Sequence, residues 1–175
     1  YAGSGSDAVN LCFDIARRHG LERNKLIDWN NPKSSARPQM AFFDGVYGGG
    51  RGDALGMNWE RFSAGSKLDL SKYKLPSPTT TKLPVTDPAE IERLVLIENE
   101  ALTKLRALAT DPKDPLGAVF SEPIQGSKGV LCYRPEFMTA LRALADELNL
   151  PIIADEVLTS GGRTGKFFAF QHYEG

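Results

Sequence analysis

The sequence predicts an α/β fold, with a mostly parallel sheet and helices on both faces. The main indication is a unit near the C-terminus, where two short apolar segments, 118–120 and 152–154, flank an amphipathic segment at 135–148. Two buried strands joined by a helix are typical of a parallel βαβ crossover. A third apolar run, 39–43, ends at an Asp-Gly pair and is predicted to be a buried strand that leads into a loop.

The first predicted helix follows the glycine- and serine-rich residues 3–7. Its apolar residues recur at helical spacing, and they are Ala8, Leu11, Cys12, Ile15 and Ala16. Gly20 is the expected C′ residue, and the polar residues 21–38 are predicted to form connecting structure. Ser4 resembles a capping residue, so the amides around Gly5 and Ser6 should lie at the positive end of the helix.

The middle of the chain is rich in glycine and proline. Residues 45–52 are predicted to form a loop with five glycines around Tyr47 and Arg51. Residues 57–84 show no regular pattern, and their prolines argue against a continuous helix or a central strand. A second helix is predicted to begin after Asp87, which is a suitable N-cap. Proline follows it at the first helical position, and Glu90 stands three residues after the cap.

The composition argues against several classes of function. The 21 Lys and Arg residues are balanced by 22 Asp and Glu residues, so a broad basic surface for nucleic acid is not expected. The longest aliphatic run, 94–97, is far shorter than the roughly 20 residues that span a bilayer. No signal peptide is recognisable, so we expect a soluble, cytoplasmic chain. Cys12 and Cys132 lie in apolar segments and are expected to be free, buried thiols.

Four acidic residues follow the predicted strands, and they are Asp44, Glu122, Asp155 and Glu156. In open α/β sheets, ligands bind beyond the carboxyl ends of the strands. Taken singly, such acids are more often loop caps or ion-pair partners. Asp155 differs because it leaves a buried strand directly, where a charge without a cationic partner is costly.

The N-terminal residues 3–8 also fit the pattern G-x-G-x-x-A, with Asp28 about 20 residues further on, as in a dinucleotide fingerprint. That fingerprint needs a strand before the first glycine, and only two residues precede it. The narrower interpretation is a phosphate site at a helix N-terminus, with plain helix capping as the alternative.

Two further motifs are assigned no special function. The tripeptide at 51–53 is Arg-Gly-Asp, and it is interpreted as part of the glycine loop rather than as an adhesion signal. His19 and His172 are far apart and have no further ligand at a suitable spacing, so no metal site is predicted.

Three blocks in the C-terminal third resemble the class III aminotransferases that depend on pyridoxal 5′-phosphate (PLP). The blocks are V-F-S-E-P-I-Q-G at 119–126, I-A-D-E-V at 153–157 and G-R-T-G-K-F-F-A at 162–169. Residues 3–8 resemble the phosphate-binding turn of the same family, and 44–49 resemble its loop bearing an aromatic residue. The resemblance covers essentially the whole chain, more loosely at 21–38 and 57–84.

The resemblance implies PLP as cofactor and assigns roles to individual residues. The phosphate would bind the amides and hydroxyl of Gly5 and Ser6. Tyr47 would stack on one face of the ring and Val157 on the other. Asp155, the implied catalytic residue, would face the pyridinium nitrogen, since a buried carboxylate keeps that nitrogen protonated and the cofactor needs this to act as an electron sink.

Other positions match the family less fully. Glu122 and Gln125 would line the cofactor side of the sheet. Gly48 stands where the family commonly has His, and Ser127 where many members that take omega-amino donors have Glu. Leu158, also assigned to the cofactor site, stands where Gln often reaches the phenolic oxygen of PLP.

The implied reaction is amino transfer from an amino acid or amine to a keto acid, in a homodimer. Decarboxylase, racemase or aminomutase chemistry on the same cofactor remains open, as does a non-catalytic homologue that acts as a binding protein. The resemblance implies that residues 1–175 are part of the large domain, with the Schiff-base lysine and the small domain beyond Gly175. Neither Lys128 nor Lys166 is assigned that role, so the chain alone is expected to be inactive.

Overall fold

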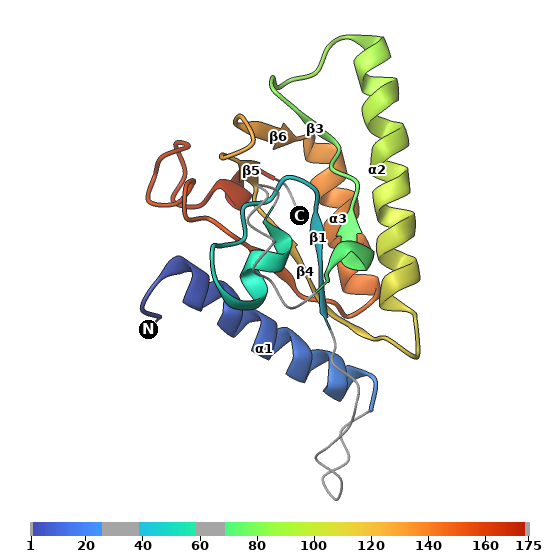
Figure 1. Cartoon of the computed structure of the whole chain (residues 1–175). Helices are drawn as coiled ribbons and strands as arrows, with labels where there is room; N and C mark the ends of the chain where they lie inside the picture. The colour runs from blue at the N-terminus through green and yellow to red at the C-terminus, as the bar shows by residue number, and fades with distance from the viewer. Residues whose placement is uncertain (1, 26–38, 59–68, 174–175) are drawn as a thin grey trace, which may run out of the picture.

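A parallel sheet forms the centre of the fold in the computed structural model, which describes residues 2–25, 39–58 and 69–173 (Figure 1). Within these ranges the sheet has four strands in the order β2-β1-β4-β7. The strands are β1 (Gln39–Phe43), β2 (Lys74–Leu75), β4 (Leu116–Ser121) and β7 (Ile152–Ala154). Every residue of β1 and β4 is buried, because these two strands occupy the middle of the sheet.

The predicted βαβ crossover is confirmed. Strand β4 pairs in parallel with β7, with Val119 opposite Ile152, and helix α3 (Pro135–Glu147) lies between them in the chain. Neighbouring residues of a strand face opposite sides of a sheet. Phe120 lies in a pocket with α1, whereas Ser121 lies in a pocket with α3, so helices cover both faces as predicted.

Helix α1 (Gly5–Arg23) is longer than the sequence predicts. The expectation that Gly20 ends the helix was wrong, since Gly20 is a buried helical residue and Asn24 is the C-cap. The extra turn is stabilised by tertiary contacts. The Arg23 guanidinium donates hydrogen bonds to the carbonyl oxygens of Leu148 and Leu116, each at 2.8 Å, and also to that of Ala109. Residues 26–38, including Asp28 of the dinucleotide pattern, lie outside the described residues.

Helix α1 lies very close to the sheet at Gly117. A Cβ atom at this position would lie 2.0 Å from the carbonyl oxygen of Ala16, which is a backbone atom and cannot rotate away. Val9, Phe13 and Ala16 are buried in this interface. The glycine therefore fixes the distance between the helix and β4.

Helix α2 (Pro88–Ala109) begins where the sequence predicts, because the Asp87 carboxylate accepts a hydrogen bond from the Ala89 amide at 3.1 Å. It runs beside α3 (Figure 1). A buried ion pair joins the Glu98 carboxylate of α2 to the Arg134 guanidinium at the start of α3, at 2.8 Å. No helix among the described residues combines the length and the apolar character needed to cross a membrane.

A second, antiparallel sheet has the order β3-β6-β5. Its strands are β3 (Thr79–Thr80), β5 (Ile124–Gln125) and β6 (Leu131–Tyr133). The sequence did not predict this sheet, because strands of two or three residues are too short to show a period. The described part of 57–84 contains short 3₁₀ turns and two strands of two residues, β2 and β3. Each is an edge strand of its sheet, in keeping with the prediction that no central strand lies there.

Candidate cofactor site

A pocket of about 320 Å³ lies at the carboxyl ends of β4 and β7. Its walls come from the first turns of α1, the glycine loop after β1 and the segment after β7. The lining residues are Gly5, Ser6, Ala8, Val9, Cys12, Tyr47, Gly48, Gly49, Phe120, Ile153, Ala154, Asp155, Glu156 and Val157. Five of the seven residues that the sequence assigned to cofactor binding are therefore brought together here.

One end of the pocket is the N-terminus of α1. Ser4 is the N-cap, and its hydroxyl accepts a hydrogen bond from the Asp7 amide at 3.2 Å, while its carbonyl accepts one from Ala8 at 3.0 Å. The amides of Gly5 and Ser6 precede these and have no acceptor within the helix. Free amides at the positive end of a helix form a binding site for an anion such as phosphate.

The glycine loop packs directly on this helix end. The Ser6 hydroxyl accepts a hydrogen bond from the Gly50 amide at 3.0 Å. Gly49 adopts a φ of 152°, and a Cβ there would lie 2.9 Å from the Ser6 hydroxyl oxygen. Asn10, one turn further along α1, donates to the Arg51 carbonyl and accepts from the Ala54 amide.

The Arg-Gly-Asp tripeptide belongs to this same loop. Its Asp53 carboxylate pairs with the Arg17 guanidinium of α1 at 2.5 Å. The tripeptide therefore fastens the glycine loop to α1, in agreement with its interpretation as part of the loop.

Asp155 lines the pocket from the segment directly after β7. Its amide donates to the Ser121 carbonyl at 2.8 Å, which continues the sheet pairing by one residue. Burial raises the pKa of the Asp155 carboxyl, and the neighbouring charge of Glu156 acts in the same direction. Within the described ranges no cationic side chain forms an ion pair with Asp155. This carboxylate suits a ligand that brings its own positive charge, as a protonated pyridine nitrogen does.

Tyr47 and Val157 also line the pocket, and both have exposed side chains. Tyr47 is 43% exposed and Val157 is 75% exposed. The floor is apolar and is formed by Val9, Phe120 and Ile153. A flat ring packed against these side chains would exchange water for apolar contact, so the lining is chemically suited to an aromatic ring such as that of PLP.

Cys12 also lines this pocket, which the sequence did not predict. Its apolar helical spacing indicated burial but not a ligand-facing position. Burial and the charge of Asp155 both raise the pKa of the Cys12 thiol. The thiol is therefore protonated at neutral pH and is a wall of the pocket rather than a nucleophile.

Glu122 and Leu158 are the two assigned residues that do not line this pocket. Glu122 is 5% exposed, and its carboxylate turns to the backbone of the glycine loop, where it accepts a hydrogen bond from the Tyr47 amide at 2.6 Å. Leu158 is 52% exposed and covers Gly126, where a Cβ would lie 2.1 Å from the leucine Cδ1. Gln125 is fully buried and donates to the Asp44 carbonyl at 2.9 Å, so it also lies behind the loop.

The structure explains why glycine can stand at position 48, where the family commonly has histidine. Gly48 has a φ of 68°, a left-handed conformation that side chains disfavour. A Cβ there would also lie 3.1 Å from the Ala54 carbonyl oxygen and from Met57. In this chain, the loop conformation therefore favours glycine at position 48.

The two lysines that the sequence left unassigned are engaged away from the pocket. The Lys128 ammonium pairs with the Asp44 carboxylate at 3.2 Å, and the Lys166 ammonium donates to the Gln171 carbonyl at 2.6 Å. Neither residue lines the pocket.

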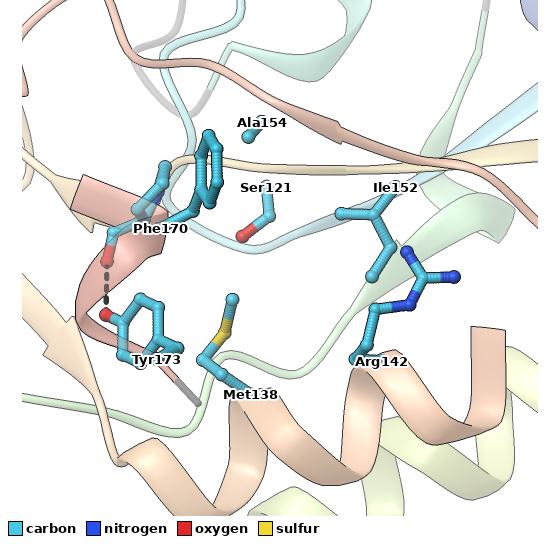
Figure 2. Close-up of a pocket in the computed structure, with 8 residues that line it drawn as sticks. Ser121, Met138, Arg142, Ile152, Ala154, Phe170 and Tyr173 are labelled. Carbon is cyan, nitrogen blue, oxygen red and sulfur yellow. Dashed lines mark hydrogen bonds between the residues drawn. The ribbon is translucent and has the colours of Figure 1, made fainter. Parts of the chain in front are cut away.

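A second pocket, of about 340 Å³, lies on the other face of the sheet (Figure 2). Arg142 and Met138 of α3 form one wall, and the Arg142 guanidinium is paired with Asp146. At the opposite side the Tyr173 hydroxyl donates to the Pro123 carbonyl at 3.0 Å. None of the residues assigned to cofactor binding lines this pocket, so the pocket beside α1 is the candidate site.

The fold and the first pocket define an α/β protein with a pocket at the carboxyl ends of its strands, into which the N-terminus of α1 opens. All of residues 1–175 match the family model described as aminotransferase class-III. The chain belongs to the class III aminotransferase family.

Individual relatives are similar over most of this chain. An acetylornithine aminotransferase from Vibrio parahaemolyticus is 30% identical over 177 residues, which cover 98% of this chain and 34% of the relative. A putrescine aminotransferase from Pectobacterium atrosepticum is 48% identical over 60 residues, which cover 34% of this chain and 13% of the relative. The solved lysine aminotransferase of M. tuberculosis superimposes with a TM-score of 0.75 at 26% identity, covering 98% of this chain and 38% of that structure. The chain thus spans about a third of the length of such relatives.

Proposed function

We propose that residues 1–175 are part of the PLP-binding large domain of an aminotransferase, which moves an amino group from an amino acid or amine to a keto acid. The observation that carries the proposal is the convergence of three features on one pocket. These are the helix N-terminus at Gly5 and Ser6, the aromatic ring of Tyr47 and the carboxylate of Asp155. Membership of the class III family supports the same conclusion.

Each of these residues has a physical task in the proposed site. The amides of Gly5 and Ser6 bind the phosphate, aided by the helix dipole. Tyr47 and Val157 hold the ring from its two faces and exclude water. Asp155 stabilises the proton on the ring nitrogen, and the ring nitrogen in turn compensates the charge of Asp155. When bound, PLP supplies an electron sink for the negative charge that develops on the substrate carbon.

The rest of the site is proposed to come from outside residues 1–175. Lys128 and Lys166 are engaged elsewhere, which supports placing the Schiff-base lysine in another part of the protein. We also propose a homodimer, as the family resemblance implies, and a cytoplasmic location. Cys12 and Cys132 are free thiols and are only partly buried, whereas the sequence predicted burial.

The substrate class follows from the relatives rather than from the pocket. Their names include acetylornithine, putrescine and lysine, which all carry a terminal amino group. We therefore propose a donor with a primary amine at the end of an aliphatic chain, although Ser127 stands where many family members that take such donors have Glu. Its binding groups would lie in the part of the protein outside this chain.

The test is an assay of the purified full-length protein with PLP, a panel of such amines and amino acids, and several keto acids. Transfer of nitrogen to the keto acid, with conversion of the visible PLP spectrum by donor alone, is the expected result. Release of carbon dioxide or loss of chirality without amino transfer would assign another PLP reaction. Failure to bind PLP at all would favour a non-catalytic binding protein and contradict the proposal.

A further inference from the structure

We propose that Glu122 is a positioning residue that clamps the backbone of Tyr47 and Gly48, and so fixes the aromatic wall of the cofactor pocket without touching the cofactor. The inference deepens the proposed function and rests on it, since the wall matters only if a ring binds there. It also replaces the expectation that Glu122 contacts the cofactor directly.

The clamp is anchored in the sheet. Glu122 follows Ser121, the last residue of β4, which pairs with Ala154 of β7. The Glu122 side chain is 5% exposed, so its carboxylate does not reach solvent freely. The Tyr47 amide donates to its Oε1 at 2.6 Å, and the amides of Gly48 and Gly126 also act on this carboxyl and lower its pKa.

The loop needs such an anchor because its own backbone is unusually free. Gly45, Gly48 and Gly49 have φ angles of 95°, 68° and 152°, and glycine loses more conformational entropy on ordering than any other residue. The segment between them carries Tyr47, whose side chain is partly exposed at the pocket. The Tyr47 carbonyl accepts a hydrogen bond from the Gly49 amide, and the Ser6 hydroxyl accepts one from the Gly50 amide. The Glu122 carboxylate adds the acceptor for the amide of Tyr47 itself.

Gln125, which belongs to the same segment 119–126 as Glu122, holds the start of the glycine loop. The Gln125 amide group donates to the Asp44 carbonyl at 2.9 Å and to the Tyr133 hydroxyl at 3.1 Å. Glu122 and Gln125 thus bind the loop at two points, one through its N–H groups and one through a carbonyl. The pattern E-P-I-Q contributes a backbone support rather than a pair of cofactor ligands.

The surroundings of Glu122 act on its charge in opposite directions. Burial raises the pKa of this carboxyl to about 7, and the charge of Asp155 adds to that effect, whereas the three amide donors oppose it. Among the described residues, Tyr133 also interacts electrostatically with Glu122. A buried carboxylate that accepts several backbone N–H groups makes stronger hydrogen bonds than a neutral acceptor does.

The experiment measures hydrogen exchange of the Tyr47 and Gly48 amides in the full-length protein, with and without PLP, together with the dissociation constant of PLP. The variants are Glu122→Ala, which removes the acceptor, and Glu122→Gln, which keeps a neutral one. Glu98→Gln is the matched control, because Glu98 is a buried glutamate whose carboxylate pairs with Arg134 away from the loop.

In Glu122→Ala we expect the two amides to exchange about 10- to 100-fold faster, which corresponds to the loss of one charge-assisted hydrogen bond. The dissociation constant of PLP should rise about tenfold by the same reasoning, with Glu122→Gln between this variant and wild type. Glu98→Gln should leave both quantities unchanged. If Glu122→Ala does not fold, intermediate exchange in Glu122→Gln carries the test.

Unchanged exchange at both amides in the two Glu122 variants would overturn the clamp. Faster exchange with wild-type affinity for PLP would overturn the claim that the clamp serves the cofactor pocket. If the wild-type protein itself fails to bind PLP, the proposed function fails, and the exchange data still decide whether the clamp exists.

Discussion

The carboxylate of Asp155 accepts a hydrogen bond from the backbone amide of Val157, with 3.0 Å between Oδ1 and the nitrogen. This contact ties together two residues proposed to touch the same ring, one at its edge and one on its face. It also orients the carboxyl group by a local turn, so the position of the acid does not depend on an ion pair. A charged ligand can therefore enter without breaking one.

We predict that Asp155→Ala lowers turnover of the full-length enzyme by several orders of magnitude and leaves its folding intact. The variant loses the charge that keeps the ring nitrogen protonated, while the folded chain loses a carboxylate whose burial is unfavourable. Turnover and the thermal unfolding midpoint are the two measurements. Near-normal amino transfer by the variant would show that Asp155 does not face the cofactor.

Ser6→Ala should weaken PLP binding about tenfold, the cost of roughly one hydrogen bond to a charged group. The same variant should bind pyridoxal, which lacks the phosphate, as wild type does. The ratio of the two affinities separates a phosphate contact from a general disturbance of the loop that Ser6 supports through Gly50. Equal losses for both ligands would place the phosphate elsewhere.

The stability of the apoprotein should depend on Glu122 in a defined pH window. Its folded pKa of about 7 lies above the ordinary value of 4.5, so the folded state binds this proton more tightly than the unfolded state. Stability is therefore lost as the pH rises through this interval. Glu122→Gln has no proton to lose at this position. The unfolding free energy of this variant minus that of the wild type should therefore rise by up to about 3 kcal/mol between about pH 5 and pH 8. A constant difference across this range would contradict the assignment.

Gly117→Ala should destabilise the protein by at least about 3 kcal/mol or prevent folding, because the added Cβ meets the Ala16 carbonyl at 2.0 Å. Gly5→Ala is the control for stability. A Cβ at Gly5 has no atom within 4 Å, so chemical denaturation should show little change in that variant. A mild effect at Gly117 would mean that α1 can move away from the sheet.

Leu158→Gln tests a position whose role the pocket lining leaves open. If residue 158 approaches the phenolic oxygen of PLP, a hydrogen-bond donor there should change the pH at which the visible band of the bound cofactor converts between its forms. Spectral titration of the two holoproteins measures this. Superimposed titrations would show that Leu158 does not approach the cofactor and only packs over Gly126.

The sequence predicted the regular elements well where local signals and burial agree. Strands β1 and β7 were predicted residue by residue from short apolar runs, and the start of α2 from the cap at Asp87. The end of α1 was wrong because its last turn depends on Arg23, which binds carbonyl groups about 86 to 125 residues away along the chain. Local pattern carries no information about such contacts.

In the site, too, local motifs predicted which residues come together, whereas contacts between distant residues could not be predicted. Gly5, Ser6, Tyr47, Val157 and Asp155 meet in one pocket, as the family motifs implied, because they stand at strand ends or at a helix N-terminus. The motif could not show that its glutamate turns toward loop amides rather than toward a ligand. That distinction depends on the backbone of a loop 75 residues earlier in the chain.

The central claim is that PLP binds between the N-terminus of α1 and Asp155. The most direct test is a crystal structure of the full-length protein grown with PLP. We predict density for the phosphate at the amides of Gly5 and Ser6, the ring beside Tyr47, and the ring nitrogen within hydrogen-bond distance of the Asp155 carboxylate. PLP bound elsewhere, or bound in this pocket with its ring nitrogen away from Asp155, would contradict the claim.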